Sequence, residues 1–72
     1  MDRNAAAAVQ EYEDAMASFL AHARSGDASQ SDLDLRSRLY RAGIEIERLE
    51  LRQTPACRDA VLRADSRAWA MR

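Results

Sequence analysis

His22 and Cys57 are the residues of this chain whose side chains could act as a base and a nucleophile, and each is the only one of its type. A histidine can take up a proton near neutral pH and a thiolate is a strong nucleophile, so such a pair could perform nucleophilic catalysis. Cys57, however, falls on the predicted inner side of the last helix, where a free cysteine behaves as a small hydrophobic residue. We therefore expect no catalytic residues and predict that the protein is not an enzyme.

Other motifs that carry chemistry are missing from the sequence. It contains no glycine-rich phosphate loop, no cysteine and histidine spacing typical of a metal site, and no serine-centred nucleophile motif. One histidine and one cysteine can form neither a cluster of these metal ligands nor an intramolecular disulfide. We predict no cofactor, no metal and no small-molecule substrate. The chemical alternative that stays open is a redox sensor acting through Cys57.

The fragment EYED supplies three acidic residues, Glu11, Glu13 and Asp14. Paired carboxylates can bind a cation or act as acid and base, but they must point into one site. On a helix, Glu11 and Glu13 point about 200° apart and do not converge. The fragment is therefore interpreted as a solvated face of a helix.

All cations of the chain are arginine, and several lie in the last segment. Arg63 and Arg67 share a helical face, and a short helix after a tight turn is typical of helix-turn-helix DNA readers. The alternative function is therefore a small DNA-binding transcriptional regulator. Its contacts with phosphates would come from Arg58, Arg63, Arg67 and Arg72. The net charge of −1 and the few residues suited to reading bases place this alternative second, and ion pairing with neighbouring helices also explains these arginines.

The segment 5–25 has the pattern of a helix. Its apolar residues alternate four and three positions apart, as in a helix that packs lengthwise against another. Asn4 fits an N-cap, and Gly26 fits the position after a helix C-terminus. The polar stretch GDASQS, 26–31, predicts a loop and therefore an antiparallel helical hairpin. The apolar seam consists of Ala5, Val9, Tyr12, Met16, Phe19 and Ala23.

The segment 32–53 is predicted to be a helix with two apolar sides. The alternation in IEIERLEL could indicate a strand, but the apolar residues change face within the fragment, whereas the helical spacing continues. One stripe contains Leu35, Leu39, Ala42, Ile46 and Leu49, and the second, roughly opposite, contains Leu33, Tyr40, Ile44 and Leu51. Such a helix has to be covered twice. The first helix covers one side, and the third helix or a second chain must cover the other.

Thr54 and Pro55 mark the start of a shorter third helix, predicted over 55–71. The residue before a proline avoids the α-helical region, and proline suits the first position of a helix. Leu62 and Trp69 lie off the inner stripe of this helix. That stripe contains Cys57, Val61, Ala64, Ala68 and Met71. The chain 1–72 is therefore predicted to be a single all-α domain of three helices.

The apolar content of the chain favours association with another protein. Large apolar residues are few, and much of the remaining apolar content is alanine, which buries little area. A chain of 72 residues is near the size at which one core barely suffices for stability. We favour a non-enzymatic protein–protein interaction module, acting as a homodimer or in a heteromeric complex as an adaptor, chaperone-like partner or assembly subunit. The candidate interface residues are Tyr40, Ile44, Leu51, Leu62 and Trp69.

Composition also suggests where the protein works. The use of arginine without lysine, together with frequent alanine, points to a bacterial chain. No apolar run is long enough to cross a membrane, so a membrane is not among the expected partners. The N-terminus lacks the hydrophobic core of a signal peptide, and the cytoplasm is therefore the expected location.

Overall fold

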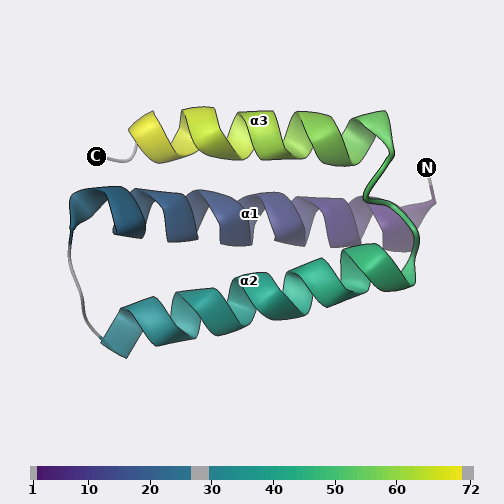
Figure 1. Cartoon of the computed structure of the whole chain (residues 1–72). Coiled ribbons are helices and arrows are strands. Elements are labelled where there is room, and N and C mark those ends of the chain that lie inside the picture. Colours follow the sequence, from purple (N-terminus) through teal and green to yellow (C-terminus); the bar gives the residue numbers. More distant parts are fainter. Residues whose placement is uncertain (1, 27–29, 71–72) are drawn as a thin grey trace.

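The computed structural model describes residues 2–26 and 30–70, which form three α-helices (Figure 1). Helix α1 spans Arg3–Ser25, α2 spans Gln30–Arg48 and α3 spans Pro55–Ala70. The centre of the predicted loop 26–31 lies outside the described residues. The prediction of an all-α, compact three-helix domain is confirmed.

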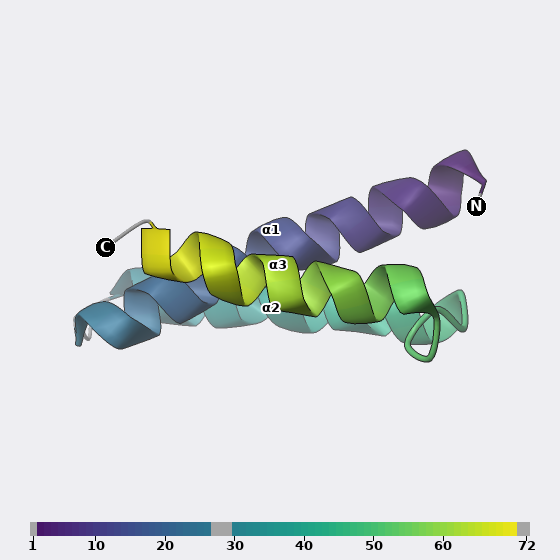
Figure 2. The same cartoon turned by 90° about the horizontal axis from the view of Figure 1, so that it is seen from above.

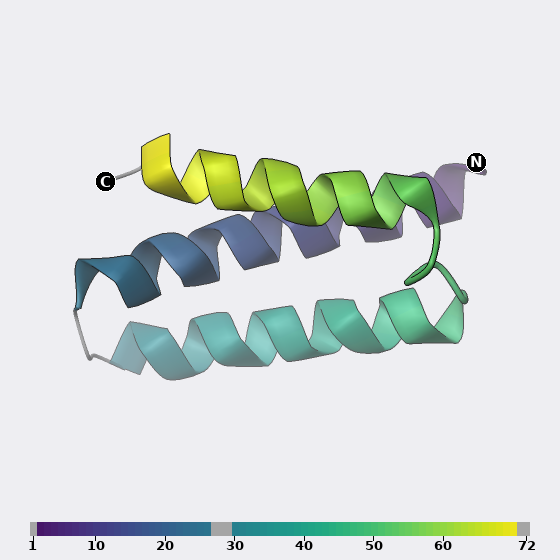
Figure 3. The ribbon, with the colours of Figure 1, turned by 45° about the horizontal axis from the view of Figure 1, so that its top comes forward.

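Helix α1 is the central helix of the domain. It runs antiparallel to α2 on one side and parallel to α3 on the other (Figures 1 and 3). It is also inclined to both neighbours (Figure 2). Within the described residues, α2 and α3 do not pack against each other. Helix α3 therefore does not cover the second side of the helix 32–53, and of the two predicted covers for that side a second chain is left. It is α1 that is covered on both sides, because its small and apolar residues occupy a broad arc of its circumference.

The two ends of α1 are closed by local hydrogen bonds. Asp2, and not the predicted Asn4, is the N-cap, and its Oδ1 accepts a hydrogen bond of 2.7 Å from the backbone N–H of Ala5. Gly26 ends the helix in the left-handed conformation, with φ of 74°, as the sequence predicts. The helix therefore begins two residues earlier than predicted. Of the predicted apolar seam, Ala5, Val9 and Tyr12 are buried, whereas Ala23 is exposed.

Helix α2 ends at Arg48, before the predicted end at 53. The N–H of Glu50 donates to the carbonyl of Glu47, and the N–H of Leu51 donates to the carbonyl of Ile46 at 2.9 Å. Together with the positive φ of 56° at Glu50, these two bonds form a Schellman motif. This motif usually has a glycine at the left-handed position. Because this chain has a glutamate there, the end of the helix could not be predicted from the sequence. The motif folds Leu51 back toward Ile46, and both side chains are buried.

Helix α3 begins where the sequence predicts. The backbone N–H of Cys57 donates to Oγ1 of Thr54 at 3.3 Å, which makes Thr54 the N-cap in front of Pro55. The buried stripe is rotated slightly from the predicted one. Ala60 is fully buried, whereas Val61 is at the edge of the core and more than a third exposed. Met71 lies outside the described residues.

The core of the domain consists mainly of alanine, and most of the largest apolar side chains lie outside it. Ile46 is the largest fully buried side chain. The buried alanines are Ala5, Ala8, Ala15, Ala17, Ala42, Ala60, Ala64 and Ala68. The exposed large apolar residues are Leu33, Tyr40, Ile44, Val61, Leu62 and Trp69. Small residues at a helix contact allow close approach of the two helices but bury little area, so this core leaves much apolar surface in contact with water.

Candidate protein-interaction surface

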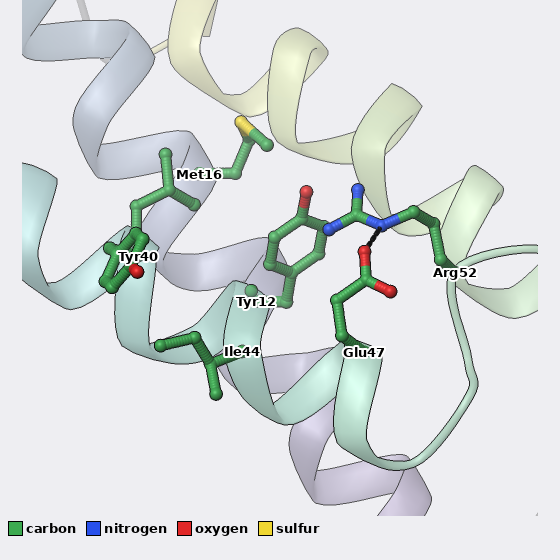
Figure 4. A pocket seen from close by; sticks show the side chains of 8 residues that line it. Tyr12, Met16, Tyr40, Ile44, Glu47 and Arg52 are labelled. Atoms are coloured by element: carbon green, nitrogen blue, oxygen red, sulfur yellow. Dashed lines mark hydrogen bonds and ion pairs between the residues drawn. The ribbon is translucent and has the colours of Figure 1, made fainter.

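A groove lies between α2 and α3, with Tyr12 and Met16 of α1 at its floor. It forms because α2 and α3 flank α1 without touching each other. On the α2 side, a pocket of about 310 Å³ is lined by Tyr12, Met16, Tyr40 and Ile44, among others (Figure 4). On the α3 side, a pocket of about 390 Å³ is lined by Tyr12 again and by residues that include Leu62. The shared tyrosine makes the two pockets parts of one feature, which we call the α2–α3 groove.

Arg52 divides the α2–α3 groove into its two pockets. It comes from the turn between α2 and α3, forms an ion pair with Glu47, and extends its guanidinium past the hydroxyl end of Tyr12 (Figure 4). The pKa of Arg52 is raised, first by its hydrogen bond with Glu47 and then by Tyr12. The charged group therefore lies beside the Tyr12 side chain, and the groove combines apolar walls with a cation that is paired with Glu47.

Gly43 lies at the edge of the pocket on the α2 side. A Cβ placed on Gly43 would be 3.9 Å from the Tyr12 ring and 4.0 Å from the Arg52 guanidinium, which are ordinary contact distances. The glycine is therefore not needed for close approach of another helix of this chain. Its effect is to leave a notch in the surface of α2.

The predicted interface residues are divided by the fold. Tyr40 and Ile44 are exposed and line the pocket on the α2 side, and Leu62 is exposed and lines the pocket on the α3 side. Trp69 is exposed two turns after Leu62 on α3 and is not among the residues that line these pockets. Leu51 differs, because the turn after α2 buries it in the core with 8% of its surface exposed. It does not contribute to a surface that another molecule could reach.

Trp69 is held in place by Arg24 of α1. The guanidinium carbon of Arg24 lies 4.2 Å from the centre of the Trp69 ring, a cation–π contact. Arg24 also forms an ion pair with Asp65 on the previous turn of α3. One face of the indole is thus covered, while about half of the side chain stays exposed. A large aromatic residue with a fixed orientation is well suited to act as an anchor at an interface.

Glu13 forms an ion-pair cluster with α3, which is the pairing with neighbouring helices that the sequence offered as an explanation of the arginines. Its two carboxylate oxygens accept hydrogen bonds from Nε of Arg63 and Nη1 of Arg67, each at 2.8 Å. Asp14 accepts a further bond from Arg67 at 2.7 Å. The pKa of Glu13 is lowered, chiefly by the hydrogen bond from Arg63. The predicted solvated face is therefore wrong at Glu13, which is 6% exposed. The cluster could have been inferred from the charge distribution of the sequence. Acidic residues are in excess over residues 1–25, and basic residues are in excess over residues 54–72.

Two of the four arginines of the DNA-binding alternative form ion pairs within the chain, one is exposed, and one lies outside the described residues. Arg63 and Arg67 bind the acidic residues of α1, as described above. Arg58 is exposed and lines the pocket on the α3 side. Arg72 lies outside the described residues. The structure brings Arg63 and Arg67 together on one face, as predicted, but that face is turned toward α1.

His22 and Cys57 are not brought together. His22 is near the C-terminal end of α1, and Cys57 is in the first turn of α3, which lies at the opposite end of α1 because the two helices are parallel (Figure 1). Cys57 is 2% exposed, and burial raises the pKa of its thiol. A buried thiol of raised pKa reacts slowly, so its burial opposes the redox-sensor alternative.

The chain has been compared with protein-family models, with curated proteins and with solved structures, and none matches. Among residues 2–26 and 30–70 there is no group of three or more His, Cys, Asp or Glu side chains that could hold a metal ion. In the same part of the chain, no helix has the length and apolar character needed to cross a membrane. A functional proposal for this chain therefore rests on its fold class and on the exposed apolar side chains of α2 and α3.

Proposed function

We propose that the protein is a non-enzymatic protein–protein interaction module that binds through the borders of the α2–α3 groove. The residues that make the contact are Tyr40, Ile44, Leu62 and Trp69. The observation that carries this proposal is the inverted distribution of apolar residues, with alanine inside and larger side chains outside. An adaptor, a chaperone-like partner or an assembly subunit would each use such a surface.

The exposed side chains supply the free energy for association. Fully burying a Leu or Ile side chain contributes about 1.5–3 kcal/mol, and aromatic residues are frequent energetic centres of interfaces. Tyr40 is 72% exposed and Leu62 is 68% exposed, so most of this gain is still available to a partner. Large apolar patches on a folded chain mark interaction sites.

DNA binding is the weaker candidate for this chain. A phosphate-binding surface needs cations that are free to release counterions, and Arg63 and Arg67 are already neutralised by Glu13 and Asp14. Affinity for duplex DNA that falls steeply with salt would favour this alternative over protein association.

Site-specific photo-crosslinking tests the proposed function. A photoreactive phenylalanine analogue is placed at Tyr40, at Leu62, or at Gln10 as a control, in chains expressed in cells. Gln10 is exposed and, two positions from Tyr12 on α1, points about 200° away from the floor of the groove. We expect protein adducts from positions 40 and 62 and none from position 10. Absence of adducts from both groove positions in a folded chain would overturn the proposal.

A further inference from the structure

Four residues of α2 lie along one exposed face of the helix, which we call the α2 face: Arg36, Tyr40, Ile44 and Glu47. Their spacing of four, four and three positions puts them on the same side of a helix. Tyr40 and Ile44 are 72% and 49% exposed. The side chains of Arg36 and Glu47 are 65% and 62% exposed. The face therefore carries an arginine, paired with Asp32, toward its N-terminal end and a glutamate, paired with Arg52, toward its C-terminal end. The residues between them are apolar.

This order of charges is complementary to itself when a second α2 lies antiparallel to the first. In a two-fold symmetric contact, the same residues meet on both sides. If Tyr40 lies opposite Gly43 of the partner subunit, Arg36 lies opposite Glu47 of the partner subunit, because each is four residues further out. The symmetry then forms this ion pair twice. A parallel contact would instead place Arg36 against its own copy.

In this antiparallel arrangement, the ring of Tyr40 of one chain would meet Gly43 of the other and the pocket beside it. Gly43 has no side chain, and the pocket of about 310 Å³ beside it is lined by Tyr12 and Met16. Tyr40 is the most exposed of the large apolar residues in the described part of the chain. A protruding aromatic side chain and an apolar pocket on the same helix face are the two halves of a reciprocal contact, in which each copy gives a tyrosine and receives one.

We propose that a second copy of this chain is the partner of the α2 face, docked antiparallel with Tyr40 over Gly43 of the partner subunit. The proposal rests on the proposed function and names the partner for the α2 side of the surface. The ion pairs within the chain are compatible with it. Arg36 contacts Asp32 through Nε at 3.0 Å, and Arg52 contacts Oε1 of Glu47, so the terminal guanidinium nitrogens and the second carboxylate oxygen can bind the partner.

Charge reversal tests the antiparallel contact. Arg36→Glu and Glu47→Arg each turn both interchain ion pairs into repulsions, so each variant alone should dimerise at least about tenfold more weakly than the unmodified chain. In an equimolar mixture, Glu at 36 of one variant faces Arg at 47 of the other, and Glu47 of the first faces Arg36 of the second. Mixing should therefore restore dimers that neither variant forms alone. Sedimentation equilibrium from micromolar to millimolar concentration measures the association.

Two further variants complete the experiment. Arg3→Glu reverses an exposed charge on α1 and should leave dimerisation unchanged. Tyr40→Ser removes the inserted ring without touching an ion pair and should weaken the dimer by at least about tenfold. The substituted side chains are exposed, so circular dichroism should show the same helix content in each variant.

The proposal is overturned if the unmodified chain stays monomeric up to millimolar concentration, or if the mixture associates no more than its components. A monomer that still gives crosslinks to other proteins at positions 40 and 62 would leave the proposed function in place and remove the second copy as the partner. A monomer without crosslinks would remove both.

Discussion

Glu13 is a buried carboxylate, and both side chains that donate hydrogen bonds to it belong to another helix. Arg63 and Arg67 approach it from α3, so one side chain of α1 holds two successive turns of its parallel neighbour. The arginine side chains are 56% and 44% exposed, which lets water solvate their charges if the carboxylate is lost. The cluster therefore fixes the orientation of α3 at a moderate free-energy gain.

Replacement of Glu13 by glutamine tests this cluster. Glu13→Gln removes the charge and should lower the free energy of unfolding by about 1–2 kcal/mol, because a buried charge-assisted pair is lost while the arginines stay solvated. Glu11→Gln is the matched control. Glu11 pairs with Arg38 at the surface, so its loss should cost less than about 1 kcal/mol. Urea denaturation measures both, and equal effects would contradict the role assigned to Glu13.

The lowered pKa of Glu13 also predicts how stability depends on pH. A carboxyl group whose pKa is lower in the folded chain contributes stability above its unfolded pKa, and this contribution is lost as the pH falls toward the folded pKa. The ordinary value is 4.5, and hydrogen bonding by Arg63 lowers it. The unmodified chain should therefore lose more stability than Glu13→Gln as the pH falls below about 4.5. Parallel stability curves for the two proteins would contradict this.

At the scale of elements, the end of α2 is set by a strained residue. Glu50 adopts a φ of 56°, which costs a residue with a side chain roughly 1 kcal/mol. Glu50→Gly should therefore raise the free energy of unfolding by about 0.5–1 kcal/mol. Gln53→Gly in the same exposed turn is the control and should lower it, since its backbone needs no such freedom. Thermal and urea unfolding would show the opposite signs, and a loss in both would contradict the account.

The alanine stripe of α3 controls how closely α3 approaches α1. Ala60, Ala64 and Ala68 are fully buried, and no space is left for a larger side chain. Ala64→Leu should lower the free energy of unfolding by about 1–3 kcal/mol through overpacking. Ala70→Leu places the same side chain at an exposed position of the same helix and should change little. Chemical denaturation of the two variants makes the comparison, and a neutral Ala64→Leu would mean that the two helices are not in close contact.

The local signals in the sequence predicted the three helices and the antiparallel hairpin of the first two, but not the position of the third helix. The predictions that depend only on residues close in sequence were correct. These are the N-cap at Thr54, the helix end at Gly26 and the helical spacing of the apolar residues between them. The end of α2 was wrong because a left-handed glutamate has no compositional signature. The buried position of Leu51 follows from that turn, so its assignment to the interface could not be judged from helical periodicity.

At the scale of the whole molecule, the arrangement of helices follows from small residues. Two apolar stripes on the 32–53 segment suggested that it is the middle of the bundle, but alanine permits closer packing than leucine and places α1 there. The helical periodicity of a sequence shows which face of each helix is apolar. It does not show which of these faces pack against each other within one chain. The second face of α2 therefore stays exposed together with Tyr40 and Ile44, and their role at an interface stays a prediction.

Sedimentation equilibrium of the unmodified chain, followed from micromolar to millimolar concentration, most directly tests whether this exposed surface is used for association. The chain has a mass of 8.1 kDa. We predict that the measured mass rises with concentration toward twice that value and that Tyr40→Ser needs a concentration at least about tenfold higher to reach the same mass. A mass of 8.1 kDa for the unmodified chain at every concentration would contradict the claim that the exposed face of α2 binds a second copy of the chain.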